Sequence, residues 1–140
     1  MLEKEINFVS PQVTEDEKSL PLAFSIVLHS NLGLLEAQLA TLFRPHNAYC
    51  IYIDQKAPDS FYQAVTNLVE CYKSRFPNAV IFIKDKPVPI YWSDFSLLQA
   101  DLECMQELLF RHDQWKYFIN QAGTALPSVR FPYILREGLL

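Results

Sequence analysis

The sequence predicts an α/β protein built on an open, doubly wound parallel sheet. Short apolar runs of strand length alternate along the chain with longer amphipathic runs, in the order β-α-β-α-β-α-β. The first apolar run, LAFSIVL, has too few polar residues for a strand with one wet face and suits a strand covered by helices on both sides. With 140 residues, half of them hydrophobic, the chain is long enough to form one domain with its own core.

The first predicted unit is a strand, a helix and a second strand. The strands are expected at residues 22–28 and 49–53. Between them, leucines at helical spacing form one apolar face of a helix that Ser30 or Asn31 can cap. Pro45 ends this helix, because proline has no N–H group and clashes with the preceding turn.

The next unit repeats the order of helix and strand. Ser60 is expected to cap a helix that runs to about Arg75, and a strand rich in β-branched side chains follows at residues 79–83. Residues 84–89 are expected to form a loop, because their two prolines are barred from a helix interior and from a central strand.

A third helix is predicted at residues 97–110. We expect its leucine and methionine face to pack in the core, and we expect Glu103 and Glu107 to lie on its solvated face. A fourth strand is expected at residues 115–120, and residues 129–140 are predicted to begin another helix. The predicted core face of the third helix consists of Leu98, Leu102, Met105 and Leu108–Phe110.

Composition excludes several classes of function. The net charge is -4 and no basic stripe runs along the chain, so nucleic acid is not an expected partner. Residues 1–18 are charged and polar, unlike a signal peptide, and no apolar run is long enough to cross a membrane. We therefore expect either a cytosolic protein or one whose targeting segment lies outside this sequence. The three cysteines show no CxxC spacing, so no zinc site is predicted, and composition alone favours reduced cysteines.

Two polar residues follow the first two predicted strands, His29 and Asp54. In open α/β sheets, ligands bind outside the carboxyl ends of the strands. A histidine there can donate to a phosphate or a base carbonyl, and an aspartate can accept from a ribose or a base N–H. The GxGxxG, GxxxxGK[ST] and GxSxG motifs are absent, which argues against dinucleotide, P-loop and nucleophile-elbow chemistry. The alternative roles are a hydrogen bond from His29 to a neighbouring loop and a cap by Asp54 on the following turn.

Four blocks stand out in chain order: SIVLHS, LATLFRPHNAYCIYIDQKAPDSF, YWSDFSLLQADLECMQELL and WKYFINQAGTALPS. Together they resemble the N-terminal part of the core-2/I-branching β-1,6-N-acetylglucosaminyltransferase family, whose larger group includes peptide O-xylosyltransferases. The resemblance covers residues 21–140. We therefore expect residues 1–20, which lack clear periodicity, to be a lead-in segment. Residues 21–140 are expected to be the N-terminal, nucleotide-binding part of a glycosyltransferase domain whose C-terminal half is absent.

The resemblance implies a GT-A-like, Rossmann-related fold and a Golgi enzyme on the lumenal side of the membrane. Attachment to the membrane is expected only through a segment absent from this chain. The implied reaction transfers N-acetylglucosamine, with inversion, from a UDP-sugar to an O-glycan of a glycoprotein acceptor, and xylose is the alternative donor sugar. Members of the family need no metal ion and no other cofactor, and the absence of a DxD motif from this sequence agrees with that.

Matching the family's motifs residue by residue implies four contacts with the nucleotide sugar. Val27 and His29 are expected against the uracil and ribose of UDP, and Asp54 is expected on the uridine. Trp92 matches a position that lines the nucleotide-sugar site in the family, but packing in the core or in its loop is the favoured alternative.

The resemblance also implies a disulfide between Cys50 and Cys104, which match a bonded pair of the family. A lumenal enzyme folds under oxidising conditions, so this expectation replaces that of three reduced cysteines. Cys71 matches a cysteine whose partner in the family lies upstream of this region, and we expect it outside the bridge.

No catalytic residue is assigned in this chain. Inverting transfer needs a carboxylate that deprotonates the acceptor and positive charge on the departing diphosphate. The resemblance implies that both belong to the C-terminal half, and Lys56 and Lys116 are cations without a partner pattern. Ala125 stands where the family usually has an aspartate. The alternative function is therefore a non-catalytic relative that binds a nucleotide or a partner.

Overall fold

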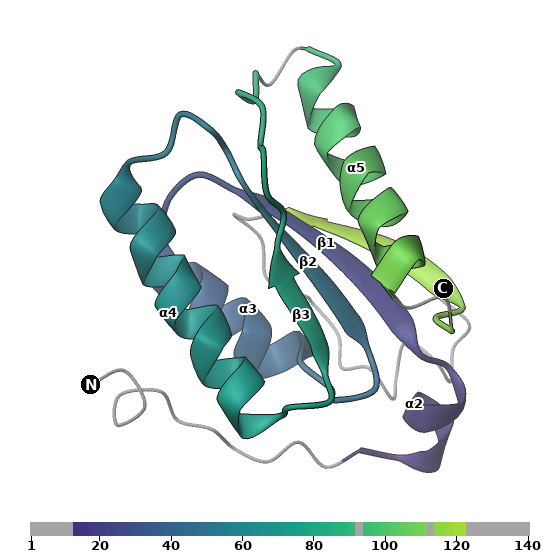
Figure 1. The fold of residues 1–140 in the computed structure, drawn as a ribbon. Helices are drawn as coiled ribbons and strands as arrows, with labels where there is room; N and C mark the ends of the chain where they lie inside the picture. The colour runs from purple at the N-terminus through teal and green to yellow at the C-terminus, as the bar shows by residue number, and fades with distance from the viewer. Residues whose placement is uncertain (1–12, 92–93, 112–113, 123–140) are drawn as a thin grey trace.

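The fold is a four-stranded parallel sheet between two layers of helices (Figure 1). The structure is a computed structural model, and it describes residues 13–91, 94–111 and 114–122. The strands lie in the order β3-β2-β1-β4. The strands are β1 (Leu22–Leu28), β2 (Ala48–Ile53), β3 (Val80–Ile83) and β4 (Tyr117–Ala122). The predicted doubly wound α/β sheet is confirmed.

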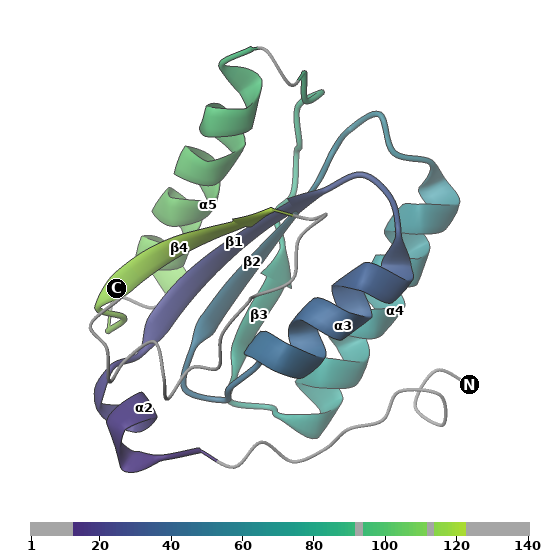
Figure 2. The ribbon, with the colours of Figure 1, turned by 180° about the vertical axis from the view of Figure 1, so that it is seen from behind.

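Helices α3 (Leu32–Leu42) and α4 (Asp59–Arg75) cover one face of the sheet, and α5 (Ser96–Arg111) covers the other, as the two opposite views show (Figures 1 and 2). The chain first winds outward from β1 through β2 to β3 and then returns across the sheet to β4, beside β1. Because such crossovers are right-handed, the return places α5 on the opposite face. The winding direction therefore reverses between β1 and β4.

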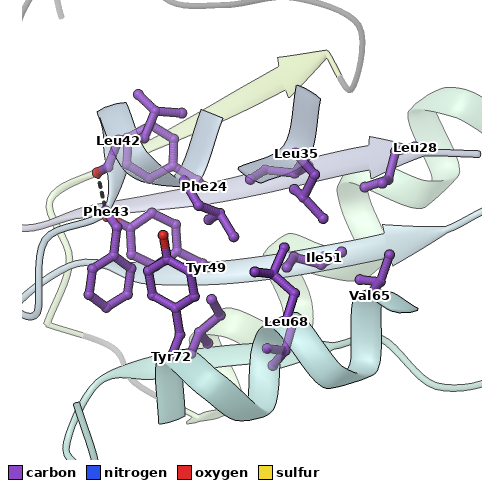
Figure 3. Close-up of a cluster of buried hydrophobic side chains, with 14 of the residues drawn as sticks. Phe24, Leu28, Leu35, Leu42, Phe43, Tyr49, Ile51, Val65, Leu68 and Tyr72 are labelled. Carbon is purple, nitrogen blue, oxygen red and sulfur yellow. Dashed lines mark hydrogen bonds between the residues drawn. The ribbon is translucent and has the colours of Figure 1, made fainter. Parts of the chain in front are cut away.

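The larger core lies under α3 and α4 (Figure 3). Successive side chains of a strand point to opposite faces, so Phe24 on β1 and Tyr49 on β2 face this layer. Their rings stack at 5.3 Å between centroids, and Phe43 lies 5.2 Å from Tyr49 on its other side. The Tyr49 hydroxyl donates to Leu42 O at 2.7 Å and accepts from Arg44 N at 2.7 Å. Tyr49 therefore ties the end of α3 to the sheet.

The opposite face, under α5, combines small buried residues with larger ones such as Tyr52 and Phe82. Ala23, Ala48 and Cys50 on the strands are fully buried, as are Ala100 and Cys104 on the helix. Small side chains on both sides let the helix backbone come close to the sheet. The structure joins Cys50 and Cys104 in a disulfide, with their Cα atoms 5.7 Å apart, as the resemblance implies. Cys71 lies on α4, half-buried and outside this bridge.

The predicted core face of α5 was right at Leu108 and wrong at Leu98, Leu102, Leu109 and Phe110. The helix turns Ser96, Ala100, Cys104 and Leu108 toward the sheet, at a spacing of four residues. Apart from Leu108, these inward residues are small, and they pack against the small residues of β1 and β2. The larger side chains face outward, with exposed fractions of 52% for Leu98, 46% for Leu102, 51% for Leu109 and 88% for Phe110.

Two helix starts also differ from expectation. Pro58, not Ser60, is the N-cap of α4, and Ser60 lies inside the helix. A short helix that was not expected, α2 (Glu15–Ser19), precedes β1. Its signal is a capping box, in which Thr14 and Glu17 each accept from the other's backbone N–H.

Glu17 attaches this lead-in helix to the sheet domain. Its side chain is 2% exposed, and one oxygen accepts from Arg44 Nε at 3.2 Å. The helix predicted at residues 129–140 lies outside the described residues. None of the described helices is both long and apolar enough to cross a membrane.

Candidate functional site

A pocket opens at the carboxyl ends of β1 and β2, on the side of the sheet that α5 covers. Its volume is about 100 Å³, below the roughly 300–1,000 Å³ of sites that enclose a whole small ligand. It can therefore hold one ring-sized group of a larger ligand. The pocket is lined by Val27, Leu28, His29, Asp54, Lys56, Ile90 and Leu97.

The first strand brings Val27 and His29 to the pocket. Val27 is half-buried and packs against the α5 side of the core, so it offers an apolar wall. His29 follows the last residue of β1 and is exposed, so its imidazole is accessible from solvent at the pocket. The structure thus places three of the four predicted contact residues, these two and Asp54, in one pocket.

Asp54 links three segments at this edge. Its N–H donates to Leu28 O at 2.9 Å, which joins it to the end of β1. Its Oδ1 accepts from the N–H groups of Lys56 at 2.9 Å and Ile90 at 3.1 Å. Asp54 therefore caps the turn after β2, in keeping with the alternative role, and it also holds the loop that follows β3.

The second carboxylate oxygen of Asp54 pairs with Lys56. Oδ2 lies 3.6 Å from Lys56 Nζ, and the Asp54 side chain is 8% exposed. Because Oδ1 already accepts two hydrogen bonds, a ligand donor would meet Oδ2. The cap and a ligand contact are thus compatible, since each uses a different oxygen.

The prediction that Lys56 has no partner was wrong. Besides the contact with Asp54, its ammonium group lies 4.4 Å from the ring centroid of Tyr91. The side chain is 49% exposed, so an anion can still approach it from solvent. Sequence reasoning missed this residue, although a lysine two positions after a strand-end aspartate was the available signal.

The prediction that Glu103 lies on a solvated helix face was also wrong. Glu103 is half-buried, and its Oε2 accepts from the Tyr52 hydroxyl at 3.0 Å. Glu107 is half-buried as well and forms an ion pair with Arg111 at 3.2 Å. Trp92 and Ala125 lie outside the described residues. Within residues 13–91, 94–111 and 114–122, no three or more His, Cys, Asp or Glu side chains form a group that could hold a metal ion.

Comparison with known proteins covers most of the chain. Residues 22–137 match the family model described as Core-2/I-Branching enzyme. The chain is 37% identical over 123 residues to human beta-1,3-galactosyl-O-glycosyl-glycoprotein beta-1,6-N-acetylglucosaminyltransferase 3. This match covers 88% of this chain and 27% of the relative. It is 36% identical over 120 residues to the bovine herpesvirus 4 beta-1,3-galactosyl-O-glycosyl-glycoprotein beta-1,6-N-acetylglucosaminyltransferase. This match covers 86% of this chain and 26% of the relative. The chain thus spans about a quarter of the length of these curated relatives.

Proposed function

The chain belongs to the Core-2/I-branching enzyme family, and from that premise we propose that it is the nucleotide-binding part of a glycosyltransferase. The donor is a UDP-sugar, UDP-N-acetylglucosamine, and the acceptor is an O-glycan of a glycoprotein. The names of the two relatives support this acceptor and this sugar. In this proposal, residues 21–140 are the N-terminal part of the transferase domain and residues 1–20 lead into it.

The observation that carries the proposal is the convergence of Val27, His29 and Asp54 on one pocket at the carboxyl ends of parallel strands. A uracil ring matches a pocket of this size, with aliphatic walls from Val27, Ile90 and Leu97. The Asp54 Oδ2 atom can accept from the uridine, and His29 can donate to its ribose or phosphate.

The proposed location is the lumenal side of the Golgi membrane. The disulfide between Cys50 and Cys104 supports an oxidising compartment, because such bonds are rare in the cytosol. We also propose that the reaction needs no metal ion. The negative charge that develops on the departing diphosphate must be stabilised by a cation. Without a metal ion, lysine or arginine side chains would supply that positive charge.

The test is the effect of UDP on thermal unfolding of the 140-residue chain, made with its disulfide formed. UDP well above its dissociation constant stabilises a chain that binds it, so the melting temperature should rise. The decisive variant is Asp54→Asn. The amide keeps an oxygen for the two backbone donors but removes the charge at the pocket, and UDP should bind at least about tenfold more weakly.

The matched control is Asp59→Asn, which removes an exposed carboxylate from the first turn of α4 and should leave the UDP effect unchanged. Adding a chelator should not reduce the UDP effect if the site works without metal. A folded chain that shows no shift with millimolar UDP would rule out the nucleotide site, and the non-catalytic, partner-binding relative would then be the better description.

A further inference from the structure

We propose that Tyr52 is a positioning residue for the candidate pocket: its hydroxyl holds the strap of residues 87–90, which forms one wall of the pocket, and Glu103 orients that hydroxyl. This inference rests on the proposed function for its ligand, UDP.

The strap is held by an unusual division of hydrogen-bond donors. Pro87 and Pro89 have no N–H, so Val88 and Ile90 carry its main-chain donors. Both donors go to side chains from β2 or its end: Val88 N–H donates to the Tyr52 hydroxyl at 2.8 Å, and Ile90 N–H donates to Asp54 Oδ1 at 3.1 Å. Two side chains at the carboxyl end of β2 therefore hold the strap through hydrogen bonds to every second residue.

Glu103 determines which way the Tyr52 hydroxyl points. The hydroxyl donates its proton to Glu103 Oε2 at 3.0 Å, which leaves its oxygen free to accept from Val88 N–H. Gln99 Nε2 donates to the other carboxylate oxygen at 3.3 Å and steadies it on α5. Burial raises the pKa of Tyr52 to about 12, so the phenol keeps the proton that this arrangement needs.

The strap connects Tyr52 to the ligand pocket in two ways. Ile90 lines the pocket, so a shift of the strap moves that wall. The Ile90 N–H also donates to Asp54 Oδ1, so the same shift releases a carboxylate that lines the pocket. Tyr52 itself is fully buried and is absent from the pocket lining, so it acts through these residues.

The test compares Tyr52→Phe with Tyr49→Phe in the 140-residue chain. The two tyrosines form a matched pair, because both lie on β2, both are fully buried, and each hydroxyl accepts from one backbone N–H. Tyr49 faces the α3 side and bonds near the other end of the sheet. Both variants should lose stability. Only Tyr52→Phe should weaken UDP binding, by about tenfold in calorimetry, and speed amide exchange at Ile90.

The two readouts separate this inference from the proposed function. If the wild-type chain does not bind UDP, the proposed function fails, and amide exchange at Ile90 still decides whether Tyr52 holds the strap. Equal UDP affinity in the two variants, together with unchanged exchange at Ile90, would overturn the inference. Glu103→Ala should reproduce the effect of Tyr52→Phe, whereas Glu103→Gln, which keeps an acceptor oxygen, should restore most of the binding.

Discussion

Removing the disulfide should cost this chain a large part of its stability. The perturbation is the double substitution Cys50→Ala and Cys104→Ala. Both residues are fully buried against small neighbours, and alanine is already common in this layer, so the native packing should change little. The main effect is then on the unfolded chain, which gains the freedom that the bridge had removed.

The magnitude follows from the length of the closed loop. The two cysteines are 54 positions apart, and the loop-entropy relation then gives about 4 kcal/mol at room temperature. This is a substantial fraction of the roughly 5–15 kcal/mol that stabilises a typical domain. The double variant should therefore unfold at much lower denaturant concentrations.

Urea unfolding followed by circular dichroism measures both the free energy of unfolding and its denaturant slope. The slope should rise in the double variant, because an unbridged unfolded chain exposes more surface. Cys71→Ala, outside the bridge, is the control and should change the free energy of unfolding much less. A loss below about 1 kcal/mol with an unchanged slope would refute the loop-entropy reasoning.

Two further predictions test the packing of the helices and the titration of His46. Leu68 lies in the buried face of α4, and Leu68→Ala should reduce the free energy of unfolding by about 2–5 kcal/mol. Leu102 is half-exposed on α5, and Leu102→Ala should reduce it by less than about 0.5 kcal/mol. Equal losses in urea unfolding would contradict the observed orientation of α5. Burial lowers the pKa of His46 from its usual 6.5, so the unfolded chain binds this proton more readily than the folded chain. The free energy of unfolding should therefore fall as the pH drops through 6.5 and level off once the folded chain is also protonated. His46→Gln should flatten this part of the curve of unfolding free energy against pH. An unchanged curve would show that His46 does not contribute to it.

The sheet could be predicted because its signal is local. Each strand is a short apolar run bounded by polar or turn residues, and each crossover needs only one amphipathic helix. The orientation of α5 could not be predicted in this way. Its sequence offers a stripe of large apolar residues and a stripe of small ones, and hydrophobicity alone favours the large stripe. The choice depends on Cys50 and its small neighbours, which are distant in the sequence.

The candidate site shows the same division. His29 and Asp54 could be placed at one edge because parallel strands deliver their carboxyl ends together. The partners of Asp54 could be foreseen only in part: the turn to Lys56 is local, but the bond from Ile90 comes from 36 residues away. The link from Tyr52 to Glu103 depends on the rotation of α5, so it was hidden by the same ambiguity.

The disulfide also divides the chain into a covalent ring and two tails. The ring, from Cys50 to Cys104, contains most of β2, all of α4 and β3, and the strap, whereas β1 and β4 lie outside it. A molecule stretched from its two ends would release β1 and β4 but could not extend the ring, which shortens the final contour by roughly 190 Å. Asp54, Lys56 and Ile90 belong to the ring, while Val27 and His29 belong to a tail. The pocket therefore lies between the ring and the tail. Pulling on the chain would separate the two sides of the pocket before any covalent link resisted.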